Sequence, residues 1–191
     1  QMAEYEIPES DLVIVDLYPF EQTVASGACE ADIIEKIDIG GISLIRGAAK
    51  NFNDVVIVAS KAQYAPLHEI LKSKGAETTL EERRFFAREA FAVSSAYDSA
   101  IFNWFDKEDK SAFRQTNDTP MSLRYGENPH QKGAFYGNFN DMLEQIHGKE
   151  ISYNNLLDIN AAVDLIDEFD ETTFAILKHN NACGLASRET L

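Results

Sequence analysis

Two short apolar runs constrain the fold of this chain most, because helical patterns alternate with them. Residues 11–17 and 54–59 are largely apolar and rich in β-branched side chains, as in strands buried on both faces of a parallel sheet. Helical spacing covers residues 30–37, 42–50, 63–73 and 79–106. The last of these begins with the capping-box pattern Thr79–Glu82. The alternation predicts α/β units joined by right-handed crossovers.

A polar stretch separates this region from a second one. Residues 107–120 are rich in Asp, Lys, Ser, Thr, Gln and Asn, which predicts a linker. Beyond it, the patterns predict strands over residues 134–136 and 172–177 and a helix over residues 155–169. The strand that ends before Lys178 is expected to be buried and to deliver the following residues to a loop at its carboxyl end. Ligands bind at such loops in open α/β sheets.

Composition and charge argue against a nucleic-acid partner, a membrane span, a disulfide framework and a metal site. The chain of 191 residues carries a net charge of −15, which argues against nucleic acid, although a few local cations and a helix amino terminus can still hold one phosphate. No apolar stretch approaches the ~20 residues of a membrane span, and no signal peptide is visible. Cys29 and Cys183 suggest a reducing cytoplasm rather than a disulfide framework. The Cys and His residues lack metal-ligand spacing, so no metal site is expected.

One candidate site lies at the start of the predicted helix over residues 42–50. Asp38 stands just before two glycines, where the backbone can approach a ligand closely and free amide donors favour anions. If this helix lines a pocket, Asp38, Lys50 and Tyr18 supply one acceptor and two proton-handling groups. The structural alternative is that Asp38 caps the helix and Lys50 favours its carboxyl end through the helix dipole.

A second candidate site is the segment Leu-Arg-Tyr-Gly-Glu-Asn-Pro-His-Gln at residues 123–131. Arg124 can hold a phosphate or a carboxylate with two parallel hydrogen bonds. The structural alternative is a polar turn that fixes its own backbone.

A third candidate site is Lys178–His179. His is the commonest general base near neutral pH, and an adjacent Lys can stabilise developing negative charge. The structural alternative is a histidine that merely ends a strand. Cys183 follows in the sequence without a second His to activate its thiol, so we expect a small buried cysteine there.

These segments, in this order, resemble the bifunctional enzymes of late purine synthesis, in which 5-aminoimidazole-4-carboxamide ribonucleotide transformylase is joined to inosinate cyclohydrolase. The family's motifs Asn-Leu-Tyr-Pro-Phe, Ile-Asp-Ile-Gly-Gly and Ala-Ala-Lys-Asn correspond to residues 16–20, 37–41 and 48–51. Its motif Leu-Arg-Tyr-Gly-x-Asn-Pro-His-Gln corresponds to residues 123–131. Residues 152–158 and Lys178–His179 also follow the family pattern, so the resemblance covers essentially the whole chain.

The resemblance implies a fold and an activity. Residues 1–106 would be the carboxyl-terminal part of a methylglyoxal-synthase-like cyclohydrolase domain, residues 107–120 a linker, and residues 121–191 the start of a cytidine-deaminase-like transformylase domain. The implied reactions are formyl transfer from 10-formyltetrahydrofolate to the nucleotide and then dehydrative ring closure to inosine monophosphate. No metal is needed. Family members are homodimers, and purine nucleotide intermediates are the implied small-molecule partners.

The resemblance also implies roles for individual residues. Lys50 would be the acid/base group of ring closure, with Tyr18 and Asp38 orienting the reacting groups. His179 would be the general base of formyl transfer, and Lys178 would stabilise its transition state. The implied nucleotide-binding residues are Val15, Asp16, Ile39, Gly40, Gly41, Asn51, Arg124 and Tyr125.

Departures from the family pattern qualify these expectations. Asp16 stands where the family usually has Asn, and Ala182 where Pro is common. The family's amino-terminal phosphate loop and most of its transformylase domain are not among the 191 residues, so we expect this chain alone to be inactive in both reactions. Two other classes of function remain as alternatives. One is a non-catalytic effector-binding module, and the other is a chain that acts mainly in dimer assembly through the long helix over residues 79–106.

Overall fold

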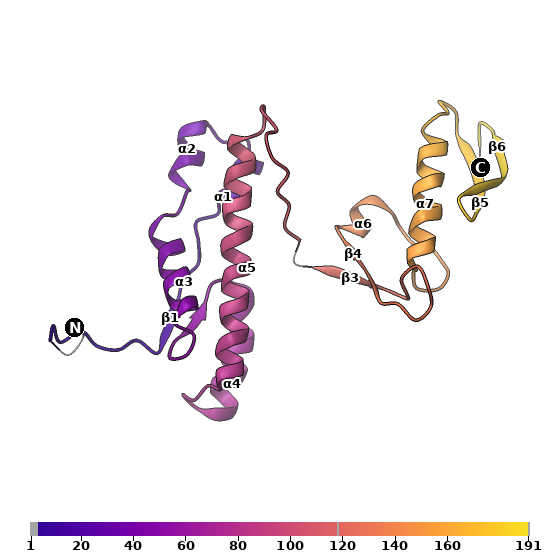
Figure 1. Ribbon diagram of the computed structural model, residues 1–191. Coiled ribbons are helices and arrows are strands. Elements are labelled where there is room, and N and C mark those ends of the chain that lie inside the picture. The colour runs from indigo at the N-terminus through magenta and orange to yellow at the C-terminus, as the bar shows by residue number, and fades with distance from the viewer. Residues whose placement is uncertain (1–3, 118, 191) are drawn as a thin grey trace. The chain divides into compact units, whose positions relative to one another are not determined.

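The computed structural model describes residues 4–117 and 119–190 as two compact units, residues 1–116 and 117–191 (Figure 1). The first unit contains β1 (Leu12–Ile14), α1 (Phe20–Ala25), α2 (Glu30–Glu35), α3 (Gly40–Lys50), β2 (Val56–Val58), the short 3-10 helix η1 (Lys61–Gln63), α4 (Tyr64–Lys74) and α5 (Leu80–Phe105). The strands β1 and β2 are parallel, with Leu12 opposite Val56. The predicted mixed α/β class with a parallel sheet is therefore confirmed.

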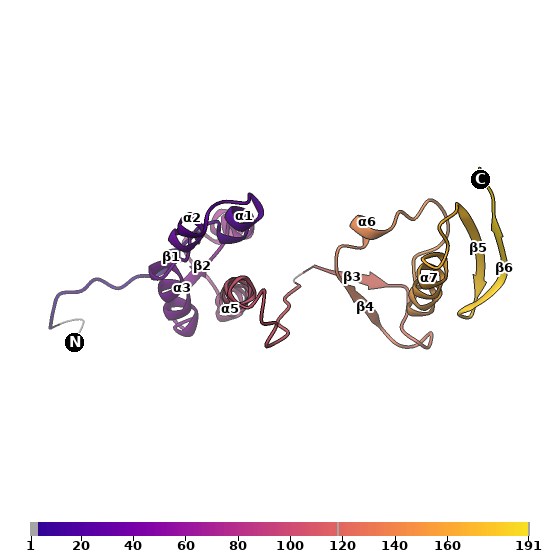
Figure 2. The same cartoon turned by 90° about the horizontal axis from the view of Figure 1, so that it is seen from above.

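The core of the first unit lies between the parallel strands and two helices. Both α3 and α5 contact β2, and α5 runs alongside α3 in both views (Figure 2). The side chains of Ile57, Val58 and Phe86 are fully buried there. A second cluster joins Phe20, Ile33 and Tyr97, in which the Phe20 and Tyr97 ring centroids lie 6.2 Å apart. The long helix α5 therefore contributes to both clusters.

The predicted capping box at the start of α5 is present. The Thr79 side chain accepts a hydrogen bond from the backbone N–H of Glu82, and the Glu82 carboxylate accepts one from the backbone N–H of Thr79. These two bonds satisfy donors that the first turn of a helix otherwise leaves free. The helix then continues for 26 residues, close to the predicted extent.

The prediction that residues 11–17 form a strand buried on both faces is wrong. β1 spans three residues, and Leu12 and Ile14 are 40% and 50% exposed. Val13 lies on the opposite face and packs against the core. Side chains alternate along a strand, and among the described residues helices cover only the face that carries Val13. The prediction for the other run is confirmed, since all three residues of β2 are buried.

The second unit consists of two antiparallel pairs of strands and two helices. Its elements are β3 (Pro120–Leu123), β4 (Gly133–Tyr136), α6 (Phe139–Met142), α7 (Tyr153–Ile166), β5 (Thr173–Lys178) and β6 (Asn181–Ser187). β3 pairs with β4, β5 pairs with β6, and α7 lies beside β5 (Figure 1). A second capping box, formed by Ser152 and Asn155, opens α7.

The expectation of a buried strand before Lys178 is also wrong. β5 alternates between half-buried and exposed residues, with Phe174 and Ile176 58% and 55% exposed. Its partner β6 is antiparallel, so the two strands form a hairpin rather than part of an open parallel sheet. The strand β6 was not predicted, because it begins with Asn181 and small residues and its middle contains Gly184, which weakens a strand pattern.

Candidate functional site

Asp38 precedes Ile39, the N-cap residue of α3, and its side chain bonds to the first turn of the helix. Its Oδ1 accepts a 2.6 Å hydrogen bond from the backbone N–H of Gly41. A Cβ at position 41 would lie 2.7 Å from the Asp38 carboxylate, so glycine permits this close approach. The Asp38 N–H donates to the hydroxyl of Tyr97, which in turn donates to the carbonyl of Lys36. Burial raises the pKa of Tyr97 above its ordinary value. These contacts agree with the structural alternative for Asp38, while its second oxygen stays available.

Lys50 lies at the opposite end of α3 from Asp38. Lys50 is the exposed last residue of the 11-residue helix α3, about 15 Å along the axis from Gly40 at a rise of about 1.5 Å per residue. Tyr18 is 56% exposed, and the Lys36 ammonium lies 5.7 Å from the centroid of its ring. The described residues therefore do not bring these three groups into one cluster.

The carboxyl ends of β1 and β2 carry other predicted binding residues. The Val15 N–H donates to the carbonyl of Val58, which extends the parallel ladder to the residue before Asp16. The Asp16 carboxylate accepts a 2.7 Å hydrogen bond from the Tyr64 hydroxyl, and this bond raises the pKa of Tyr64. The sequence analysis missed Tyr64. Its position, just after the second of two parallel strands, is the signal that could have indicated it.

The remaining predicted residues of the first unit lie at the two ends of α3. Ile39 is 73% exposed and immediately precedes Gly40, the exposed first residue of the helix. Asn51 follows the last residue of α3, and its carbonyl accepts the N–H groups of Asp54 and Val55. Asn51 thus shapes the turn into β2, while its exposed side chain is open to other contacts.

In the second unit, Arg124 and Tyr125 form one polar pair. The Arg124 guanidinium donates a 2.9 Å hydrogen bond to the Tyr125 hydroxyl, and its carbon lies 4.7 Å from the ring centroid. Hydrogen bonding by the Ser152 side chain, and after it by Arg124, holds the pKa of Tyr125 below its ordinary value. The backbone joins the pair to the start of α7, because the Arg124 N–H donates to the Ile151 carbonyl and the Tyr153 N–H to the Tyr125 carbonyl.

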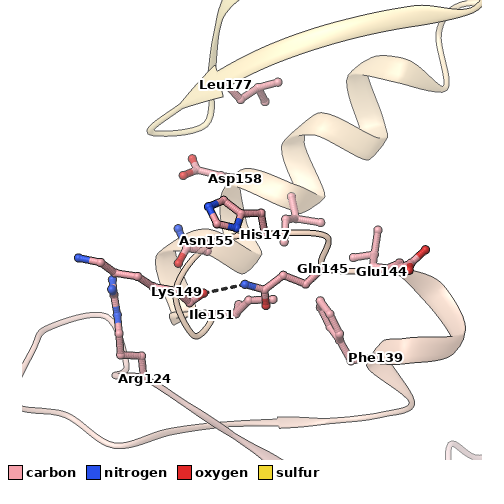
Figure 3. Close-up of a pocket in the computed structure, with 13 residues that line it drawn as sticks. Arg124, Phe139, Glu144, Gln145, His147, Lys149, Ile151, Asn155, Asp158 and Leu177 are labelled. Carbon is pink, nitrogen blue, oxygen red and sulfur yellow. Dashed lines mark hydrogen bonds between the residues drawn. The ribbon is translucent and has the colours of Figure 1, made fainter. Parts of the chain in front are cut away.

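A cavity of about 750 Å³ opens beside this pair. Arg124, His147 and Lys149 contribute basic side chains to its wall, and Figure 3 shows the Arg124 and Lys149 side chains on the same side. Asn155 and Asp158 line the cavity from α7, and Leu177 lines it from β5. The lining also includes the carboxylates of Glu144 and Asp158, so the side of the cavity that carries Arg124 and Lys149 is the part that can hold an anionic group such as a phosphate. The sequence analysis missed His147 and Lys149, which stand in a segment without periodicity.

Lys178 and His179 lie at the turn between β5 and β6. Both are exposed, and Lys178 pairs with Asn181. His179 and Asn180 have φ angles of 53° and 61°, as in the two-residue turns that favour hairpins. The Asn180 N–H donates a 2.7 Å hydrogen bond to Asp158 Oδ1, so α7 holds the tip of the hairpin.

Cys183 lies just beyond this turn, on β6. Its thiol is free and exposed, so the expectation of a buried cysteine is wrong. Cys183 belongs to the exposed first three residues of β6, so its side chain lies at the surface.

Comparison with known proteins identifies the family. The family model of the AICARFT/IMPCHase bienzyme matches residues 48–191. The chain belongs to the AICARFT/IMPCHase bienzyme family. It is 74% identical to the bifunctional purine biosynthesis protein PurH of Bacteroides thetaiotaomicron over 191 residues, which are 100% of this chain and 38% of that protein. PurH of Rhodospirillum rubrum is 48% identical over 200 residues, covering 97% of this chain and 37% of that protein.

Relatives in the AICARFT/IMPCHase bienzyme family are thus much longer than the aligned region, and this chain spans under two fifths of their length. A solved structure, the crystal structure of ForH, is 34% identical and covers 55% of this chain, with a TM-score of 0.44. Lys50, Arg124 and His179 all lie within the range that the family model matches.

The described residues hold neither a metal-ligand cluster nor a membrane-spanning helix. They contain no cluster of three or more His, Cys, Asp or Glu side chains arranged to hold a metal ion. Among the helices of residues 4–117 and 119–190, none combines the length and the apolar character that crossing a membrane requires.

Proposed function

We propose that this chain supplies parts of both active sites of an enzyme that catalyses the last two steps of inosine monophosphate synthesis. One observation carries the proposal, namely the 74% identity, over all 191 residues, to a protein named as bifunctional in purine biosynthesis. The first reaction transfers a formyl group from 10-formyltetrahydrofolate to 5-aminoimidazole-4-carboxamide ribonucleotide. The second closes the purine ring with loss of water.

The first unit would serve ring closure, within a methylglyoxal-synthase-like domain to which residues 1–106 belong. In this reaction the carboxamide nitrogen attacks the formyl carbon, and the formyl oxygen leaves as water. Lys50 would move the protons, and Tyr18 and Asp38 would orient the reacting groups, so that catalysis is mostly positioning and one proton shuttle. Nucleotide binding would involve the exposed groups around both ends of α3 and the end of β1, namely Val15, Asp16, Ile39, Gly40, Gly41 and Asn51.

The second unit would serve formyl transfer, within a cytidine-deaminase-like domain that follows the linker 107–120 and begins with residues 121–191. The substrate amine attacks the formyl carbon while His179 takes its proton, and the folate nitrogen leaves with a proton after the tetrahedral intermediate collapses. Lys178 would stabilise the oxyanion of that intermediate. Arg124 and Tyr125 would hold the nucleotide, which is supported by the Arg124 and Lys149 side chains on one side of the cavity.

The same proposal covers partners and location. Small purine nucleotides are the substrates, 10-formyltetrahydrofolate is the formyl donor, and neither step requires a metal. We propose that the enzyme is a homodimer in the cytoplasm, without a nucleic-acid or membrane partner. The net charge of −15 supports the exclusion of nucleic acid.

The test uses the complete natural polypeptide, assayed separately for formyl transfer and for ring closure. We expect Lys50→Ala to abolish ring closure and spare formyl transfer, and His179→Ala to do the reverse. Lys72→Ala, an exposed lysine of α4, is the control and should change neither. A polypeptide that binds the nucleotide but catalyses neither reaction would contradict the proposal and favour an effector-binding module.

A further inference from the structure

Asp158 connects the hairpin tip that carries Lys178 and His179 to the wall of the cavity. Its carboxylate accepts the Asn180 N–H at 2.7 Å, from a position 22 residues earlier in the chain. The same side chain lines the cavity together with Arg124 (Figure 3). One acidic group therefore contacts both the predicted general-base turn and the space in which an anionic substrate fits.

The turn needs such a contact to hold one orientation. His179 and Asn180 both adopt left-handed backbone conformations, which residues with a Cβ rarely populate. In a two-residue hairpin turn the strand ladder pairs the flanking residues, here Lys178 and Asn181, and leaves the N–H of the second turn residue outside the ladder. Asp158 accepts that N–H. A hydrogen bond to an ionised acceptor is roughly twice as strong as a neutral one.

Asp158 lies near the start of α7, close to the capping box of this helix. Asn155 completes the capping box at the start of this helix and lies three residues earlier, on the same face as Asp158. Both side chains line the cavity, below Leu177 of β5 in the view of Figure 3. The helix start, the cavity wall and the hairpin tip thus form one connected arrangement within the second unit.

We propose that Asp158 is a positioning residue for formyl transfer, whose carboxylate holds the Lys178–His179 turn at the edge of the cavity lined by Arg124. This inference rests on the proposed function of His179 as general base. A base acts only within hydrogen-bond reach of the proton that it removes, and a misplacement of about 1 Å can lower a rate about 100-fold. Loss of the Asp158 contact should therefore lower kcat for formyl transfer, while the nucleotide KM changes little.

The test compares three variants of the complete natural polypeptide. Asp158→Ala removes the acceptor, Asp158→Asn keeps a neutral acceptor oxygen, and Asp164→Ala is the control on the same helix, where the Asp164 carboxylate bonds only locally to Asn160 among the described contacts. We expect Asp158→Ala to lower kcat for formyl transfer about 10- to 100-fold, with the nucleotide KM and the ring-closure rate each within about twofold. Asp158→Asn should recover most of that loss, and Asp164→Ala should match the parent.

Other results would overturn the inference. Asp158→Ala with an unchanged kcat, or with equal losses of both activities, would show that the contact does not position the base. His179→Ala separates the two hypotheses. If it spares formyl transfer, the proposed function of the site fails. If it abolishes formyl transfer while Asp158→Ala has no effect, only the role of Asp158 fails.

A second measurement decides the question if Asp158→Ala does not fold. In the unaltered protein, the Asn180 amide hydrogen should exchange with solvent clearly more slowly than that of an exposed turn residue such as Gly148, because Asp158 holds it. Exchange of the Asn180 amide at the rate of an unprotected amide would overturn the inference.

Discussion

The Tyr64 hydroxyl donates a 2.7 Å hydrogen bond to Asp16 Oδ2, across 48 residues of sequence. Asp16 follows β1, and Tyr64 begins α4 soon after β2, so the bond joins the carboxyl ends of two parallel strands. Asp16 stands where the family pattern usually has Asn. The bond occupies one carboxylate oxygen and leaves the other for the nucleotide contact proposed above.

Removal of the Asp16 carboxylate should shift the titration of Tyr64. The bond stabilises the protonated phenol and raises the pKa of Tyr64 above 10.0, so Asp16→Ala should return that pKa toward its ordinary value. The measurement is an ultraviolet absorbance titration of tyrosinate, with Tyr64→Phe used to assign the Tyr64 component. Asp32→Ala, which removes a carboxylate bonded to the Cys29 thiol, is the control. An identical Tyr64 midpoint with and without Asp16 would contradict the assignment.

Truncation of Phe86 should strongly destabilise the first unit. Phe86 is fully buried in the core beside β2, and Phe→Ala at such positions costs about 3–5 kcal/mol of unfolding free energy. Its neighbour Phe85 contacts the Phe86 ring edge-on but is 39% exposed, so Phe85→Ala should cost clearly less. Urea unfolding of both variants measures the difference. Equal losses at the two positions would show that α5 does not bury the face assigned to it.

The stability of the first unit should depend on the charge of Glu82 in a defined pH range. The Lys74 ammonium, followed by the backbone N–H of Thr79, lowers the pKa of Glu82 below 4.5. The pKa of Glu82 is lower in the folded state than in the unfolded state. The stabilisation by the Glu82 charge is therefore present above pH 4.5 and is lost as the pH falls through the pKa of the folded state. Glu82→Gln should therefore lower the free energy of unfolding at pH 7, and the difference from the unaltered protein should disappear in acid. A difference in unfolding free energy that is the same at pH 7 and at pH 3 would contradict a stabilising role of the Glu82 charge.

Replacement of Arg124 by Lys should weaken nucleotide binding in formyl transfer. Lys keeps the charge but lacks the planar pair of donors, and it cannot stack on Tyr125 in the same way. Loss of a charge-assisted hydrogen bond of about 1.5–3 kcal/mol predicts a nucleotide KM about 10- to 150-fold higher in the complete polypeptide. Arg188→Lys is the control, because among the described contacts the Arg188 side chain bonds only to the carbonyl of the adjacent Ser187. An unchanged KM would remove Arg124 from the binding site.

Local sequence patterns identified most of the helices and the capping box at the start of α5, whereas the capping box of α7 was not predicted. Helix α5 and its Thr79–Glu82 cap follow from 3.6-residue periodicity and from hydrogen bonds that reach only three residues along the chain. The strand β2 follows from its continuous apolar run. The motifs around Lys50, Arg124 and Lys178–His179 also sufficed to indicate the family.

The tertiary structure decided what those elements do together. It showed that Leu12, Ile14, Phe174 and Ile176 remain exposed, and that Asp38 and Lys50 lie at opposite ends of α3. It also revealed the bonds from Tyr64 to Asp16 and from Asn180 to Asp158, across 48 and 22 residues. Periodicity reports the environment of a side chain relative to its own helix or strand. The partner of a side chain far along the chain depends on how the elements pack, which no local pattern encodes.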